Sequence, residues 1–263
     1  MKFTETFNKA TKFSNLKEVI YNSVKLYPNN NAFIIKEDIK KAEYKYVTYK
    51  NFLEDINCLG AALYNLGLKD KRIAICGKNS YEWALGYATN LLGNMVSIPL
   101  DKGLMLGELE SSLVRSKADA IIIDSKLEDM IKEIRANGKT NVKEYIIIGE
   151  SEEFKTVDQL LEKGKNLRKL GKNEFENAEI DNDEMKILLF TSGTTSASKA
   201  VMLTQRNIAE NIYSLQLVEK FYPTDVNLAL LPLYSLLPVI KLYVGVLTSF
   251  PSSLSFIASL ILF

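Results

Sequence analysis

The chain of 263 residues contains no histidine. This absence excludes catalysis by Ser-His-Asp or Cys-His groups, in which an imidazole moves the proton, and it removes a ligand found in most zinc sites. Net charge is nearly absent as well, since 33 lysines and arginines are balanced by 32 aspartates and glutamates. A formal charge of +1 provides no overall attraction to nucleic acid, so we expect no nucleic-acid partner.

Cysteine is scarce, and the two present, Cys58 and Cys76, form no C-x-x-C motif. We interpret them as buried thiols of a cytoplasmic protein, although their positions leave a disulfide open. The first ten residues, MKFTETFNKA, contain no continuous apolar stretch. A secretory signal peptide is therefore not expected, and we predict a cytoplasmic location.

Hydrophobic residues make up 47% of the chain, which is enough for a substantial core. From residue 72 onward, short apolar runs alternate with helical periodicity, a pattern typical of βα units. The sequence therefore predicts the α/β fold class, with a parallel sheet flanked by helices. Predicted strands cover residues 32–35, 44–47, 72–76, 95–100, 120–123, 145–148, 187–190 and 228–231. Predicted helices cover residues 14–26, 80–92, 106–117, 127–136, 157–162 and 207–220.

Local signals refine this pattern at several points. Ser14 is the expected N-cap of the first helix, and the first two strands are expected to form a hairpin. A further long helix is expected to start after Thr48 and to end at Gly67. We interpret the polar residues 151–183 as a surface excursion that carries one short helix.

The most informative stretch covers residues 185–205, where an apolar strand leads into a loop rich in hydroxyl groups. Such a loop supplies small donors and flexible backbone N–H groups, and a lysine at its end adds a positive charge, as polyphosphate binding requires. A plain surface turn is also rich in serine and glycine, but it needs only about two to five residues. The loop residues are Thr191, Ser192, Gly193, Thr194, Thr195, Ser196, Ser198 and Lys199.

The common P-loop pattern, G-x-x-x-x-G-K-(S/T), does not fit this stretch. If Gly193 is the first glycine, Lys199 falls at the lysine position. Ser198 then occupies the second glycine position, and Ala200 occupies the position of the Mg²⁺-binding hydroxyl. Two mismatches in four positions argue against that class.

The stretch instead resembles the phosphate loop of AMP-forming, adenylate-forming enzymes, and of acyl-CoA synthetases in particular. Their pattern is close to (Y/F)-T-S-G-T-T-G-x-P-K-G-V-x-L-(S/T)-H-x-N. The matching positions are Phe190 to Thr195, Lys199, Val201, Leu203, Thr204 and Asn207. The departures are Ser196, Ser198, Ala200 and Gln205. The resemblance implies the N-terminal domain of the adenylate-forming enzyme fold, in an incomplete form.

The resemblance also implies a two-step reaction with ATP, Mg²⁺ and coenzyme A. A carboxylate, here that of a long-chain fatty acid, attacks the α-phosphate of ATP, and the thiol of coenzyme A then displaces AMP. Lys199 would neutralise charge on the departing pyrophosphate, and Gly193 would let the backbone approach it. Gln205 and Tyr234 would line the wall around the acyl group or the adenylate. The phosphate-oxygen donors would be Thr191, Ser192, Thr194 and Thr195.

The likeness ends after Leu233. The family's Mg²⁺-binding glutamate and catalytic lysine have no matching position in this chain, so no catalytic residue and no metal ligand can be assigned. We therefore divide the chain into residues 1–233, the N-terminal part of an AMP-binding domain, and residues 234–263, an aberrant apolar tail. We expect the chain by itself to lack adenylation activity.

The tail is conspicuous because residues 242–263 contain no charged side chain in a chain that is 25% charged. Three interpretations remain open. A frameshift could have replaced the true continuation, the tail could be a membrane anchor of about 20 apolar residues, or it could form buried helices. Pro251 argues against one continuous helix. Membrane association, through residues 242–263 or through a fatty substrate, therefore remains a hypothesis.

Two functions follow from these observations. The first is ATP-dependent activation of a carboxylic acid, with small molecules as the partners of the chain. The second is a non-catalytic protein, either a degenerate nucleotide-binding module or a membrane-tethered interaction module. The hydroxyl-rich loop and Lys199 favour the first, and the tail favours the second.

Overall fold

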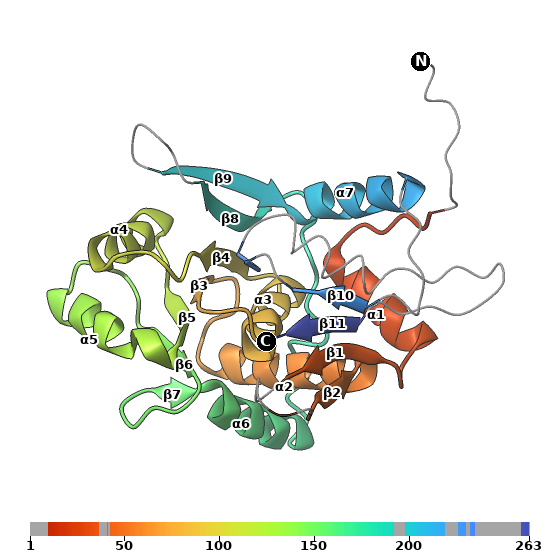
Figure 1. Cartoon of the computed structure of the whole chain (residues 1–263), viewed down its shortest axis with the longest axis horizontal. Coiled ribbons are helices and arrows are strands. Elements are labelled where there is room, and N and C mark those ends of the chain that lie inside the picture. The colour runs from red at the N-terminus through yellow and green to blue at the C-terminus, as the bar shows by residue number, and fades with distance from the viewer. Residues whose placement is uncertain are drawn as a thin grey trace, which may run out of the picture. The chain divides into compact units, whose positions relative to one another are not determined.

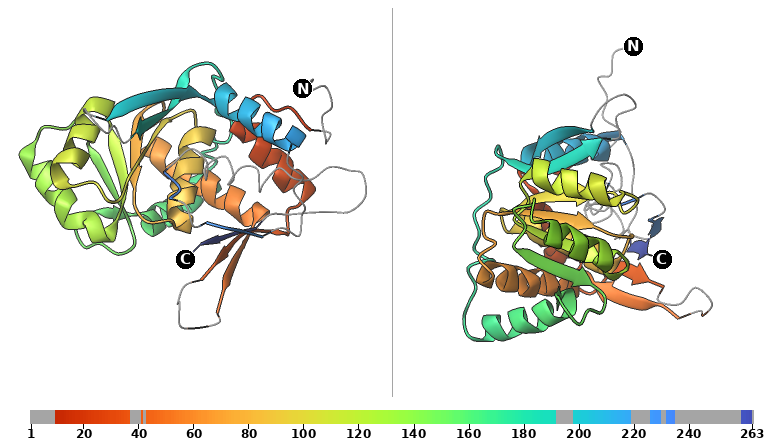
Figure 2. Two further views of the ribbon diagram at one scale, coloured as in Figure 1. Left: turned by 45° about the horizontal axis from the view of Figure 1, so that its top comes forward. Right: turned by 90° about the vertical axis from the view of Figure 1, so that its left-hand side faces the viewer.

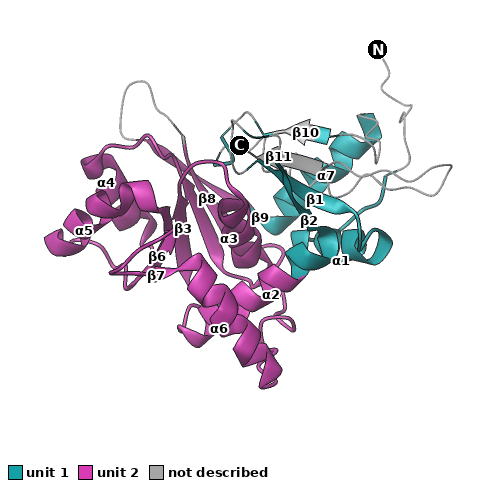
Figure 3. Ribbon diagram, turned by 60° about the horizontal axis from the view of Figure 1, so that its bottom comes forward, with its two compact units in different colours: residues 1–53, 204–263 teal, residues 54–203 magenta. Residues whose placement is uncertain are grey.

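The computed structural model describes residues 10–36, 41, 43–191, 198–218, 226–229, 232–234 and 259–262. The chain divides into two compact units, shown in different colours in Figure 3. The first unit comprises residues 1–53 and 204–263, and the second comprises residues 54–203.

The second unit is built on a seven-stranded sheet with the order β7-β6-β5-β3-β4-β8-β9 (Figure 1). Strands β3 to β6 pair in parallel, as do β4 with β8 and β6 with β7, which confirms the predicted parallel sheet. The strands are β3 (Arg72–Cys76), β4 (Val96–Leu100), β5 (Ala120–Asp124), β6 (Glu144–Ile148), β7 (Lys155–Thr156), β8 (Met185–Thr191) and β9 (Lys199–Thr204).

Helices cover both faces of this sheet. On one face, α4 (Leu106–Ser116) and α5 (Glu128–Asn137) pack against the strands, and the short 3₁₀ helix η1 (Ser125–Leu127) precedes α5 (Figures 1 and 2). On the other face, α3 (Tyr81–Leu92) approaches so closely that a Cβ on Gly86 would lie 3.1 Å from Ile122 Cδ1. Ser80 begins α3, since its hydroxyl accepts a hydrogen bond from the Trp83 backbone N–H at 3.1 Å.

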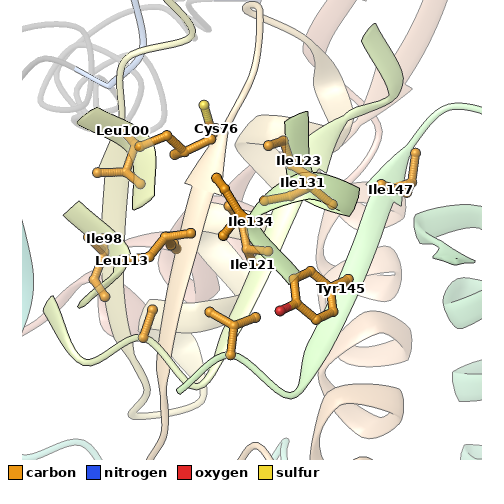
Figure 4. Close-up of a cluster of buried hydrophobic side chains, with 14 of the residues drawn as sticks. Cys76, Ile98, Leu100, Leu113, Ile121, Ile123, Ile131, Ile134, Tyr145 and Ile147 are labelled. Atoms are coloured by element: carbon orange, nitrogen blue, oxygen red, sulfur yellow. The ribbon is translucent and has the colours of Figure 1, made fainter. Parts of the chain in front are cut away.

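The core between the sheet and the pair α4 and α5 is a cluster of aliphatic side chains (Figure 4). Alternate residues of each strand point into it, because side chains along a strand alternate between faces. Each buried aliphatic side chain contributes about 1.5–3 kcal/mol of hydrophobic free energy, so the sheet is held mainly by these contacts. Labelled members are Cys76, Ile98, Leu100, Leu113, Ile121, Ile123, Ile131, Ile134, Tyr145 and Ile147.

Both cysteines are buried and free, as the sequence predicted, and no disulfide joins them. Burial raises the pKa of the Cys76 thiol to about 12, and the carboxylates of Asp101 and Asp124 act in the same direction. The folded protein therefore keeps a neutral thiol at pH values where the unfolded chain, with its usual pKa of 9.0, becomes a thiolate.

This difference predicts a loss of stability in alkali. The stabilising contribution of Cys76 is complete below pH 9.0 and disappears as the pH rises toward about 12. In that window the free energy of unfolding should fall by up to about 1.4 kcal/mol per pH unit because of this one group. Urea unfolding of the wild type and of Cys76→Ala between pH 8 and 11 measures it. Equal pH slopes for the two proteins would contradict the assignment.

Residues 151–183 are more than the predicted surface excursion. Helix α6 (Val157–Lys169) spans 13 residues and extends well beyond the predicted residues 157–162. The side chain of Phe175 is only 2% exposed, and its ring packs edge-on against Tyr64 with 5.4 Å between ring centroids. The interpretation was wrong for these parts because the buried apolar residues are single ones surrounded by charged residues.

The first unit contains a four-stranded sheet with the order β10-β11-β1-β2. Strands β1 and β2 pair in antiparallel fashion, which confirms the predicted hairpin (Figure 2). The rings of Phe33 and Phe52 pack edge to face, with 4.8 Å between their centroids. The elements are α1 (Leu16–Leu26), β1 (Asn31–Ile35), β2 (Lys45–Thr48), α2 (Tyr49–Asn65), which runs on into the second unit, α7 (Gln205–Val218), β10 (Val226–Leu228) and β11 (Ser259–Leu262).

Two predicted boundaries in this unit were wrong. Asn15, not Ser14, caps α1, since its side-chain oxygen accepts a hydrogen bond from the Glu18 backbone N–H at 3.0 Å. The strand predicted at 228–231 begins earlier, as β10 at Val226–Leu228, which pairs in parallel with β11, and residues 230 and 231 of the prediction lie outside the described residues. Thr48 does cap α2, because its hydroxyl accepts a hydrogen bond from the Asn51 backbone N–H at 3.1 Å.

The apolar tail lies mostly outside the described residues. Of residues 242–263, the structure describes 259–262, which form β11 and pair in parallel with β1 and β10. Within the described part of the chain, no helix combines the length and the apolar character needed to cross a membrane. The division at residue 233 and the anchor hypothesis stay predictions.

Candidate functional site

The candidate site begins at the carboxyl end of β8. This strand is held in the sheet by buried Ile187 and Leu188, which are 0% and 6% exposed, and Ile187 pairs with Ser97 of β4. Because β8 runs parallel to β4, its last residue, Thr191, lies at the edge where parallel α/β sheets usually bind ligands.

The structure places two of the predicted phosphate-binding residues. Thr191 ends β8, and Lys199 begins the neighbouring strand β9 with an exposed side chain. The other four, Ser192, Gly193, Thr194 and Thr195, lie outside the described residues. Strand β9 is mostly exposed, with Val201 and Met202 at 40% and 69%. The assignment of these residues to a phosphate site stays a prediction.

Arg115, in the last turn of α4, contacts residues on both sides of the loop. Its guanidinium lies 5.2 Å from the ring centroid of Phe190, near the end of β8. The same group donates hydrogen bonds to the hydroxyl of Ser198 at 3.1 Å and to the Ser198 carbonyl oxygen at 2.5 Å. Ser198 directly precedes β9, so a cation joins the two strand ends of the loop.

Thr204 and Asn207, which match the family pattern, form the N-terminal cap of α7. The Thr204 hydroxyl accepts a hydrogen bond from the Asn207 backbone N–H at 3.1 Å, and the Asn207 side-chain oxygen accepts one from the Thr204 N–H at 3.0 Å. This reciprocal pair is a capping box, which satisfies two donors at the start of the helix. These two motif residues therefore have a local structural role.

Gln205 is wholly buried in the first unit, at 0% exposure. Its side-chain oxygen accepts a hydrogen bond from the Leu16 backbone N–H at 3.1 Å, at the start of α1. Tyr234 lies in a turn of the same unit and is half-buried. The structure thus gives Gln205 a bond that positions α1, and the prediction that Gln205 and Tyr234 line a substrate wall stays untested.

In the ranges that the structure covers, no group of three or more Asp, Glu, Cys or His side chains is arranged to hold a metal ion. Those side chains alone therefore do not form a Mg²⁺ cage of carboxylates. A Mg²⁺ ion bound mainly by nucleotide phosphates does not need one.

Comparison with known proteins gives a consistent result. The family described as "AMP-binding enzyme" matches residues 20–251. A long-chain-fatty-acid–CoA ligase 5 of Rattus norvegicus is 27% identical over 210 residues, which are 72% of this chain and 30% of that protein. A long chain acyl-CoA synthetase 4 of Arabidopsis thaliana is 26% identical over 230 residues, which are 82% of this chain and 34% of that protein. The chain thus spans about a third of the length of these curated relatives.

Solved structures agree on the fold. A long-chain-fatty-acid–CoA ligase from Archaeoglobus fulgidus superposes with a TM-score of 0.80 at 19% identity, covering 99% of this chain and 49% of that one. The N-terminal domain of FACL13 from Mycobacterium tuberculosis, bound to an inhibitor, gives 0.76 at 19% identity, covering 95% of this chain and 57% of that one. These likenesses confirm the predicted α/β fold as that of the N-terminal domain of adenylate-forming enzymes.

Proposed function

This chain belongs to the AMP-binding enzymes, and we propose that the reaction it serves is the ATP-dependent activation of a carboxylic acid. In that reaction the carboxylate attacks the α-phosphate of ATP, giving an acyl-adenylate and pyrophosphate. The thiol of coenzyme A then attacks the acyl carbon and releases AMP, which leaves a thioester. The chain spans about a third of its curated relatives, so the complete reaction is proposed for the whole protein.

The observation that carries the proposal is the pair of strand ends, of β8 and of β9, that flank the residues whose sequence matches the phosphate-loop pattern. Thr191 and Lys199 stand at these two ends, at the carboxyl edge of a parallel sheet. A lysine beside hydroxyl and backbone donors stabilises negative charge that grows on the bridging oxygen as pyrophosphate departs. We assign Lys199 to that charge, and Thr191, Ser192, Thr194 and Thr195 to the β- and γ-phosphate oxygens.

The proposed acid is a long-chain fatty acid, because long-chain acyl-CoA ligases recur among the relatives at about a quarter identity. Mg²⁺ is proposed to arrive as the Mg·ATP complex and to be held by phosphate oxygens, since the described residues provide no cage for it.

Two measurements on the purified chain test this proposal. Calorimetric titration with Mg·ATP should show binding that inorganic pyrophosphate competes with, because the loop holds the phosphate end of the nucleotide. Exchange of labelled pyrophosphate into ATP with palmitate should remain at background, because the catalytic positions of the family have no match here. Absence of Mg·ATP binding would refute the phosphate-loop function. Exchange well above background would instead refute the expected inactivity.

A further inference from the structure

We propose that Arg115 is a positioning residue for the phosphate-binding loop, which it holds by joining the two chain segments that flank residues 192–197. This inference rests on the proposed function, since it concerns the same loop. Arg115 lies 83 positions before Ser198 in the chain, so only the fold brings the two together. Arg115, Phe190 and Ser198 all lie in the second unit and among the described residues.

The contacts at Ser198 fix one end of the loop. Arginine presents its donors in a rigid, planar fork, and two of them are used here, on the Ser198 hydroxyl at 3.1 Å and on its carbonyl oxygen at 2.5 Å. A pair of charge-assisted bonds from one planar group restricts both the position and the orientation of the acceptor residue. Ser198 is followed directly by Lys199, so its backbone position sets where the proposed phosphate-binding lysine begins.

The contact at Phe190 fixes the other end. The guanidinium carbon lies 5.2 Å from the centre of the Phe190 ring, which is within the range of a cation–π interaction. Phe190 directly precedes Thr191 and is partly buried against the core that contains α4. Arg115 therefore has one anchored side, toward the core, and one side that reaches the less buried strand β9.

The position of Ser198 explains why such an anchor is useful. The family pattern that this loop resembles has a proline at this position, which would restrict the backbone by itself. Serine leaves the backbone free to rotate, but it adds the hydroxyl to which Arg115 donates. The contact with Arg115 therefore restricts the backbone at position 198 in place of a proline ring. We expect Ser198→Pro to make the position of this backbone less dependent on Arg115.

Hydrogen–deuterium exchange without nucleotide tests the contact directly. In Arg115→Ala, the backbone amides of β9 should exchange several times faster than in the wild type, because the strand loses its tie to α4. The matched control is Arg135→Ala. Arg135 occupies the last turn of α5, lies 5.5 Å from the Phe154 ring and pairs with Glu153 at 2.9 Å, so it repeats the same kind of contact elsewhere. Unchanged exchange in Arg115→Ala, or an equal effect of Arg135→Ala on β9, would overturn the inference.

Titration with Mg·ATP tests the consequence for binding. Arg115→Ala should weaken the binding of Mg·ATP about fivefold to tenfold, with little change in Tm. The affinity of Arg115→Lys should lie between that of Arg115→Ala and that of the wild type. Adding Ser198→Pro to Arg115→Ala should restore most of the affinity. A wild type that binds Mg·ATP and an Arg115→Ala variant that binds equally well would overturn the positioning role and leave the proposed function standing. A wild type that does not bind would refute both.

Discussion

Replacing Gly164 with alanine is expected to destabilise the second unit by about 3 kcal/mol or more. A Cβ built on Gly164 would lie 1.7 Å from the backbone carbonyl oxygen of Cys58, far inside van der Waals contact. Because the obstructing atom belongs to the backbone of α2, it cannot rotate away, and α2 and α6 would have to separate. Alanine raises helix propensity by only about 1 kcal/mol over glycine, so the steric cost decides the sign.

Gly107→Ala is the matched control for this prediction. Gly107 is also a helical glycine, in α4, but a Cβ there would have no neighbour within 4 Å. This substitution should leave the stability unchanged or raise it by about 0.5–1 kcal/mol. Thermal unfolding should therefore show Gly164→Ala melting roughly 6–12 °C below the wild type, and Gly107→Ala at or slightly above it. Equal melting temperatures for the two variants would contradict the packing of α6 on α2.

Gly164 also shows where sequence reasoning reaches its limit. The predicted helix covered only residues 157–162, and a glycine among charged residues gives no sequence sign of close packing. In the structure α6 continues to Lys169, and Gly164 lies inside it, where the close approach of α2 leaves no room for a side chain. The contact that requires glycine at this position is made with α2, a different helix, so the local sequence around Gly164 does not show it.

The central strands were predictable for the opposite reason. Strands β3, β5 and β6 each contain a run of apolar residues, as expected for strands of a parallel sheet that helices cover on both faces. The peripheral strands carry no such signal. Strand β7 has two residues, Lys155 and Thr156, and it exists because β6 provides a pairing edge. Strand β9 is largely exposed and was not predicted.

The residues of the candidate site were also predictable only in part. The residues from Phe190 to Lys199 could be recognised because they lie together in sequence and form a dense, ordered motif. Arg115 could not, since an arginine in the last turn of a helix is ordinary and its partner is 83 positions away. Gln205 was expected at a substrate wall from its place in the motif. Its hydrogen bond to Leu16 depends on the approach of α1, which the sequence does not show.

Replacing Lys199 with alanine is expected to lower the affinity for Mg·ATP by about tenfold to a hundredfold. A charge-assisted contact to phosphate contributes roughly 1.5–3 kcal/mol, and each 1.4 kcal/mol corresponds to about a factor of ten in affinity. Stability should hardly change, because the side chain is exposed at the first residue of β9. Calorimetric titration and thermal unfolding, performed on the same samples, measure the two effects separately.

The control for this prediction is Lys143→Ala. Lys143 is also exposed and precedes β6, at the amino end of a parallel strand and therefore at the sheet edge opposite the loop. Losing one positive charge from the second unit is common to both variants, so only a local role for Lys199 predicts a difference between them. That difference should shrink as the salt concentration rises, because ions screen an exposed charge. If wild type, Lys143→Ala and Lys199→Ala bind Mg·ATP equally, the lysine does not contact phosphate, and the non-catalytic interpretation of the chain gains support.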